Sequence, residues 1–235
     1  MRILALFFFL SVFTFASLAQ DKSNYELSTG VDVCSRYIWR GLMFSDAPNI
    51  QPYMSVSWKG LTLMGWGSYA TSKNYAEIDA FLSYKTHGLS INVNDYFSEN
   101  EQDLRSSNYT QWHDTLTAHL IETSIDYVLP IEQFPLKLTA SVFVYGADLN
   151  TQKKQNYSTY FEACYPIKKG DYDVSLFAGA TTKRGYYASD AGFVNVGVKA
   201  SRNIKITDTF SIPLGSSIIY HPQNKVIFFV VSLSL

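Results

Sequence analysis

Twelve charged residues at alternating positions of otherwise apolar segments carry the chemistry that this sequence offers. The acidic members are Glu26, Asp32, Glu77, Asp79, Glu122, Asp126, Glu162 and Asp173, and the basic members are Arg36, Lys85, Lys137 and Lys199. Charged side chains inside a narrow β-barrel either line a pore and set its ion preference, or pair across the lumen and plug it. We expect a pore, whose acidic excess favours cations and neutral solutes, and keep a plugged lumen as the alternative.

The segments that must hold these charges alternate apolar and polar residues at a period of two. Residues 75–85 show the pattern, because Ile78, Ala80 and Leu82 share one face whereas Glu77 and Asp79 share the other. Similar segments recur along the chain, and they predict strands at 25–39, 50–58, 61–71, 75–85, 89–98, 115–128, 136–146, 156–166, 172–182, 192–202, 209–220 and 225–235. This pattern predicts an all-β protein, an antiparallel transmembrane β-barrel of about twelve strands, with 10 to 14 within the range of the prediction.

The links between the predicted strands alternate between tight turns and longer polar loops. Short links include Lys59-Gly60 and His87-Gly88, whereas the longer ones are 40–49, 99–114, 147–155 and 183–191. Short turns on one side of a membrane and long loops on the other are typical of outer-membrane barrels. The last segment, 226–235, is apolar at its odd positions, which predicts a barrel-closing strand and recognition of that strand by the barrel-assembly machinery.

The N-terminus predicts a secretory signal peptide over residues 1–19, leaving a single barrel domain over 20–235. Met1-Arg2 is positive, an apolar run follows, and Ser17-Leu18-Ala19 is a small-x-small cleavage site. An uncleaved N-terminal anchor is the alternative. Together with the barrel pattern, this segment predicts the outer membrane of a Gram-negative bacterium.

Composition narrows the classes of partner. The net charge of −1 shows neither of the strong charge excesses that would point to nucleic acid, so we expect no nucleic-acid partner. Aromatic residues make up 16 % of the chain, as the aromatic girdles of a membrane barrel would need. A soluble, secreted β-sandwich is kept as the alternative fold. Cys34 and Cys164 fall on strands that are far apart in the predicted barrel, so we expect small lumen-side residues and no disulfide. Scattered histidines and cysteines predict neither a metal site nor a cofactor.

The most distinctive string is Ser35-Arg36-Tyr37-Ile38-Trp39-Arg40-Gly41, which is followed by Ser45-Asp46, by Ile50-Gln51-Pro52 and by Gly65-Trp66-Gly67-Ser68. Over residues 30–100 it resembles the N-terminal signature of the TorF family of outer-membrane proteins, to which a porin function is assigned. The resemblance implies a barrel with a porin-like function and no catalytic residues. Leu235 departs from the C-terminal phenylalanine common in such barrels. From the residues themselves, we expect Tyr37 and Trp39 to face outward as girdle anchors and Arg36 to face the lumen.

Two other classes of function stay open at this stage. A lipid-modifying hydrolase of the outer membrane would need a serine activated by a histidine, and the candidates are His87, His113, His119 and His221. His119 alternates onto the outward face, but no Gly-x-Ser-x-Gly motif accompanies any histidine. A plugged structural or adhesive barrel would act through its loops. Our prediction remains passive diffusion of small polar solutes or ions, with membrane lipids and lipopolysaccharide as the other partners.

Overall fold

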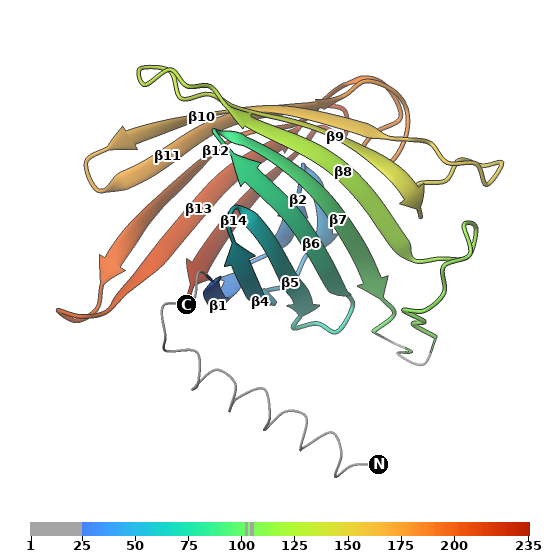
Figure 1. Cartoon of the computed structure of the whole chain (residues 1–235), viewed down its shortest axis with the longest axis horizontal. Coiled ribbons are helices and arrows are strands. Elements are labelled where there is room, and N and C mark those ends of the chain that lie inside the picture. The colour runs from blue at the N-terminus through green and yellow to red at the C-terminus, as the bar shows by residue number, and fades with distance from the viewer. Residues whose placement is uncertain (1–24, 102, 104–105) are drawn as a thin grey trace, which may run out of the picture.

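The structure is a computed structural model that describes residues 25–235 except 102, 104 and 105. Twelve strands form a closed antiparallel barrel in which each strand pairs with its neighbours along the chain and β1 pairs with β14 (Figure 1). The barrel strands are β1 (Tyr25–Cys34), β4 (Asn49–Trp58), β5 (Leu61–Ala70), β6 (Ala76–Thr86), β7 (Leu89–Glu99), β8 (His119–Val128), β9 (Lys137–Gly146), β10 (Thr159–Lys169), β11 (Tyr172–Thr181), β12 (Gly192–Lys205), β13 (Ser211–His221) and β14 (Val226–Ser234). The predicted all-β barrel of twelve strands is confirmed. The predicted signal peptide at 1–19 lies outside the described residues.

In the described part of the chain, no helix has the length and apolar character needed to cross a membrane.

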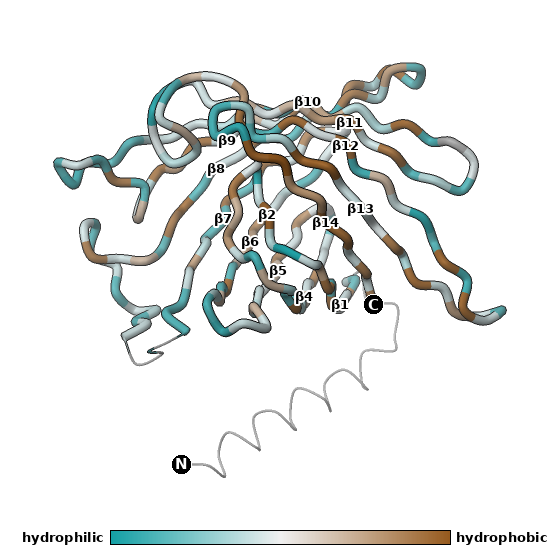
Figure 2. The backbone as a smooth tube through the Cα atoms, turned by 180° about the vertical axis from the view of Figure 1, so that it is seen from behind, coloured by the Kyte–Doolittle hydropathy of each residue, from teal (hydrophilic) through white to brown (hydrophobic). Residues whose placement is uncertain are grey.

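Alternation along the strands gives the barrel an apolar outer wall and a polar interior. Large apolar side chains stay exposed on the outer wall, with Leu27, Met54 and Ile227 each at least 67 % exposed. Brown and teal segments accordingly follow one another along the strands in Figure 2. Inside, the buried polar residues include Gln51, Asn94, Glu122, Ser141 and Asn195. The period of two therefore sorts the sequence into two faces as it does in membrane barrels.

Two tight turns at one end of the barrel have the same backbone conformation. Lys59 and Gly60 have φ values of 46° and 86°, and His87 and Gly88 have 46° and 80°. Positive φ at both central residues is the type I′ geometry that suits the twist of a two-residue hairpin, and glycine adopts it without steric cost. The longer links, 100–118, 147–158 and 182–191, all join strands at the other end, on the right of Figure 1.

The prediction of one strand over 25–39 followed by an outer loop over 40–49 is wrong. β1 ends at Cys34, and the chain then folds into a separate two-stranded hairpin of β2 (Tyr37–Trp39) and β3 (Leu42–Ser45). This hairpin pairs with no barrel strand, and Figure 1 shows β2 enclosed by the ring of strands. Its turn, Arg40-Gly41, has φ values of 49° and 81°, the same geometry as the two turns just described.

Candidate functional site

The β2–β3 hairpin spans the full width of the lumen. Near its base, Ile38 packs against a buried cluster on β1, β13 and β14 that includes Cys34 and Phe228. At its tip, Arg40 reaches Glu122 on β8 and Ser141 on β9. β14 and β8 are six strands apart in the twelve-strand ring, so they are opposite walls. The hairpin is therefore a bar across the lumen, fixed at both ends.

Arg40 is clasped by a set of polar groups at the tip of the hairpin. Its guanidinium forms a two-pronged ion pair with Glu122, through Nη1 to Oε1 and through Nη2 to Oε2 at 3.1 Å. Nη1 also donates to Ser141 Oγ at 3.2 Å and to Tyr187 Oη at 2.6 Å. The Glu122 side chain is 0 % exposed, and Tyr96 Oη and Asn94 Nδ2 also donate to its Oε2. A buried carboxylate with this many donors is well compensated, and we call this set the Arg40 clamp.

Aromatic rings surround the clamp and exclude water from it. The Arg40 guanidinium lies 4.4 Å from the ring centre of Trp39 and 4.5 Å from that of Tyr160. Burial raises the pKa of the Tyr187 hydroxyl more than the nearby Arg40 charge lowers it. Tyr187 therefore stays neutral and can accept a hydrogen bond from Arg40. Cation–π contacts of this kind gain strength where the cation is desolvated.

The expectation that Tyr37 and Trp39 face outward as girdle anchors is wrong. Trp39 packs inside the barrel with ring centres 5.2 Å from Tyr96 and 5.9 Å from Tyr187. The ring centre of Tyr37 lies 5.6 Å from that of Trp66 on β5. The physical reason is that the chain leaves the wall after Cys34, so the alternation of β1 no longer decides which way these side chains point.

The other residues of the motif shape the hairpin and its base. Gly41 is required by its positive φ and because a Cβ there would overlap the carbonyl oxygen of Val194 on β12. Ser35 is hydrogen-bonded to the backbone of Val231, which ties the base of the hairpin to β14. Ser45 caps the turn after β3 through Ala47, and Asp46 accepts a hydrogen bond from Asn74 at 3.3 Å.

The two acidic side chains of β6 form a second buried group within the lumen. Glu77 is 4 % exposed and accepts a hydrogen bond of 2.8 Å from Tyr75 Oη. Asp79 is 3 % exposed, and the backbone N–H of Phe97 donates to it at 3.3 Å. Both lie on the same inward face of one strand.

The remaining charged residues that the sequence singled out are spread over the interior. Asp126 pairs with Lys137 at 3.2 Å and accepts from Thr139 at 2.6 Å. Glu162 is hydrogen-bonded to Tyr160 and to Asn195. A cavity of about 320 Å³ beside the base of the hairpin is lined by three more of them, Asp32, Arg36 and Lys199. Strand alternation places the last three, Glu26, Lys85 and Asp173, on inward faces near the short-turn end. The structure thus brings only Glu122 of this set into the Arg40 clamp.

His119 lies on the outward face of β8, sealed beneath the link between β7 and β8. Its side chain is 0 % exposed and stacks on Trp112 with ring centres 3.8 Å apart. Nδ1 is 2.8 Å from Asp95 Oδ1, and Nε2–H donates to the carbonyl oxygen of Tyr109 at 2.8 Å. Both nitrogens are occupied, so neither can take the proton of a serine hydroxyl as a hydrolase would require. His119 instead fastens this link to the wall.

The other three histidines also have structural surroundings. His87 belongs to a type I′ turn, and exposed His113 pairs with Asp114 at 3.1 Å. His221 is buried, and Asn224 N–H donates to its Nδ1 at 3.2 Å. Cys34 and Cys164 are both free, as the sequence predicted, and the described residues contain no cluster of three or more His, Cys, Asp or Glu side chains that could hold a metal ion.

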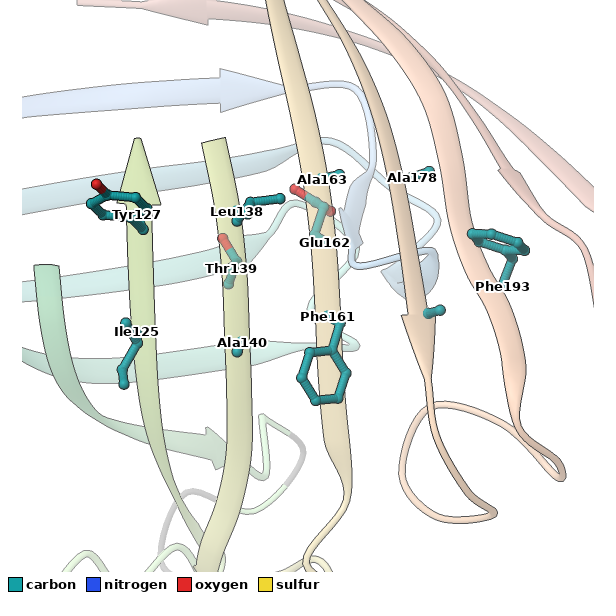
Figure 3. Close-up of a pocket in the computed structure, with 11 residues that line it drawn as sticks. Ile125, Tyr127, Leu138, Thr139, Ala140, Phe161, Glu162, Ala163, Ala178 and Phe193 are labelled. Atoms are coloured by element: carbon teal, nitrogen blue, oxygen red, sulfur yellow. The ribbon is translucent and has the colours of Figure 1, made fainter. Parts of the chain in front are cut away.

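A shallow groove of about 510 Å³ lies on the outer wall over β8 to β12 (Figure 3). Small side chains such as Ala140, Ala163 and Ala178 form its floor, and Phe161 and Phe193 rise beside them. The two polar residues along it take part in hydrogen bonds of the lumen, Thr139 with Asp126 and Glu162 with Asn195. The groove therefore offers apolar contact and no reactive group.

Sequence reasoning missed the partners of Arg40, among them Ser141, Tyr160 and Tyr187. They come from β9, from β10 and from a link far along the chain, so no local pattern connects them. One signal was available for the hairpin itself: Arg40-Gly41 lies between two apolar segments, Ile38-Trp39 and Leu42-Met43-Phe44, which a loop in water would not favour. No protein-family model matches the chain, and no curated protein matches it either.

Proposed function

We propose that this protein is a porin-like barrel of the outer membrane of a Gram-negative bacterium, passing small polar solutes or ions, and that the β2–β3 hairpin is its constriction. The observation that carries the proposal is the hairpin itself, which crosses the lumen and packs there with aromatic side chains that include Tyr96, Phe143 and Tyr187. Spaces of about 200 Å³ and 320 Å³ lie beside it, and Glu77 lines the first whereas Asp32, Arg36 and Lys199 line the second. A purely structural core would fill such spaces with apolar side chains.

The membrane location rests on the two faces of the wall. A water-soluble barrel would not expose a continuous belt of side chains such as Leu27, Met54, Leu63, Ile125 and Phe229. Lipid would cover that belt, and lipopolysaccharide would meet the charged links at the rim. The TorF resemblance of residues 30–100 supports the same proposal. We propose no catalytic role, because the outward histidine with the best position, His119, has both nitrogens occupied.

The charges near the hairpin support a preference for cations. Glu77 and Asp79 are both buried on the inward face of β6. Arg40, the basic residue at the tip of the hairpin, is already neutralised by Glu122. A permeating ion would therefore meet negative charge in the space that Glu77 lines, whereas Arg36 and Lys199 outnumber Asp32 in the space at the base of the hairpin.

The test is single-channel conductance of the refolded mature protein in planar bilayers, with the reversal potential measured under a salt gradient. We expect small, cation-selective steps for the wild type and larger or longer steps for Arg40→Ala, because that variant frees the tip of the hairpin. Arg202→Ala is the matched control, since Arg202 contacts Tyr172 at the exposed short-turn end. Wild-type and Arg40→Ala barrels that insert correctly and both stay silent would overturn the channel and favour a plugged barrel acting through its loops.

A further inference from the structure

A partly open cavity of about 200 Å³ lies beside the hairpin, between β6, β7 and the link that precedes β12. Four aromatic side chains line it, contributed by four separate elements: Trp39 on β2, Phe44 on β3, Tyr96 on β7 and Tyr186 on the link. Glu77 is its one charged lining residue. The rings of Trp39 and Phe44 meet edge to face at 6.0 Å, and Trp39 and Tyr96 are 5.2 Å apart. The walls are thus ring surfaces held in place by one another.

The charge on this cavity is not balanced by a basic side chain. Among the described residues, no Lys, Arg or His nitrogen lies within 4.0 Å of the Glu77 or Asp79 carboxylate. The other polar partners of Glu77 and Asp79, which are the Tyr75 and Tyr37 side chains and the backbone N–H of Phe97, are neutral, and the two carboxyl groups also hydrogen-bond each other. A carboxyl pair that shares one proton still carries one buried negative charge, and a bound cation would offset the cost of burying that charge.

The cavity walls favour one class of cation over another. Strongly hydrated metal ions need several carboxylate or carbonyl oxygen ligands at once, whereas the side chains of this cavity supply one carboxylate and otherwise only the hydroxyls of Ser98, Tyr96 and Tyr186. Alkylammonium groups are weakly hydrated and bind to the faces of aromatic rings, and cages of several rings recognise quaternary ammonium in particular.

We propose that this cavity binds a small organic ammonium ion, of the size of a tetramethylammonium or choline headgroup, with Glu77 as its counter-charge. The proposal names a substrate class for the channel and in that respect rests on the proposed function. Access is from the end with the longer links, because Ser98, Ala118 and Ala147 line the cavity where β7, β8 and β9 meet those links. An ammonium ion in the cavity lies directly against the hairpin, through Trp39 and Phe44.

The test is titration of the detergent-refolded protein with choline, followed by calorimetry and by tryptophan fluorescence, to which Trp39 is one of four contributors. The uncharged carbon analogue of choline, 3,3-dimethylbutan-1-ol, and sodium ions are the two comparison ligands. We expect choline to bind at least about tenfold more tightly than either, because each lacks the charge or the alkyl surface that the walls recognise.

Two variants and one control locate the binding. Glu77→Gln keeps the side-chain size and removes the charge, and Phe44→Leu removes one ring, so each should weaken choline binding by about tenfold or more. Glu162→Gln removes a lumen carboxylate outside the cavity and should leave the affinity unchanged.

Equal affinity for choline and its neutral analogue, or choline binding that Glu77→Gln leaves intact, would overturn the site. The titration needs no conduction, so its outcome is separate from that of the channel. Choline binding by a barrel that is silent in bilayers would refute the channel and leave the site, whereas conduction without binding would refute the site alone.

Discussion

Replacing Arg40 by methionine tests whether the Arg40 clamp is a main source of stability inside the barrel. Methionine keeps most of the side-chain volume and removes the charge together with every hydrogen bond of the guanidinium. Glu122 then stays buried at 0 % exposure without its counter-charge, since its remaining donors, Tyr96 and Asn94, are neutral. Glu122→Leu removes the other partner of the ion pair and leaves Arg40 unmatched.

The magnitude follows from the geometry of the pair. Breaking a buried ion pair by removing one partner costs about 3–5 kcal/mol, mainly because the other charge is left unpaired. The hydrogen bonds of Arg40 to Ser141 and Tyr187, and the ring contacts with Trp39 and Tyr160, overlap with that cost and do not simply add to it. We therefore expect Arg40→Met to lower the free energy of unfolding by about 4 kcal/mol.

The assay is reversible denaturant unfolding of the lipid-reconstituted barrel, carried out as a double-mutant cycle. We expect the double variant Arg40→Met/Glu122→Leu to be more stable than either single variant, because an apolar pair leaves no buried charge. Arg202→Met, at an exposed position, should change the unfolding free energy by less than about 0.5 kcal/mol. If the two single losses simply add in the double variant, within about 0.5 kcal/mol, the clamp is not an energetic unit and the reasoning fails.

Three further predictions concern other parts of the chain. Gly41→Ala should lower the unfolding free energy by about 2 kcal/mol or more, because alanine resists positive φ and its Cβ would overlap the carbonyl oxygen of Val194 on β12. Gly65→Ala, with open space at its Cβ, serves as control, and equal effects of the two substitutions would contradict the tight fit of the turn. His119→Ala removes the contacts to Asp95 and Trp112, so the link between β7 and β8 should become sensitive to protease while the barrel strands stay protected. An unchanged cleavage pattern would show that other contacts hold the link. Mass spectrometry of the protein from the membrane fraction should show the loss of residues 1–19, and an intact N-terminus would indicate an anchor.

The barrel could be predicted from sequence because alternation is a local signal. In β6, the apolar members Ile78 and Leu82 stand on the outer wall while Glu77 and Asp79 stand inside, as the two-residue period requires. Type I′ turns at Lys59-Gly60 and His87-Gly88 mark where two of the barrel hairpins reverse. These features repeat in every part of the chain, so an error of a few residues at one strand end leaves the count of twelve intact.

The interior was harder to predict because its contacts are not local. The segment from Tyr37 to Trp39 continues the alternation of β1, so period alone extends that strand past Cys34 and turns both rings outward. Arg40 is stabilised inside the lumen by its ion pair with Glu122, which lies on the opposite wall, on β8. The inward positions of charged residues could be predicted, but which of them would pair could not, because pairing depends on where the hairpin crosses.

The sequence separations within the clamp have a consequence for the order of assembly. Arg40 is 82 residues from Glu122, 101 from Ser141 and 147 from Tyr187, while the strands that close the ring, β1 and β14, are the first and last of the fold. Contacts with such separations form late, because the chain between them must first give up its freedom. The hairpin is synthesised early, and its Tyr37 and Trp39 rings can pack on β5 and β7, but Arg40 has no partner in the clamp until strands β8 and β9 are in place. A half-assembled barrel therefore holds the hairpin without the Arg40 clamp, and a completed clamp marks a wall that is already built.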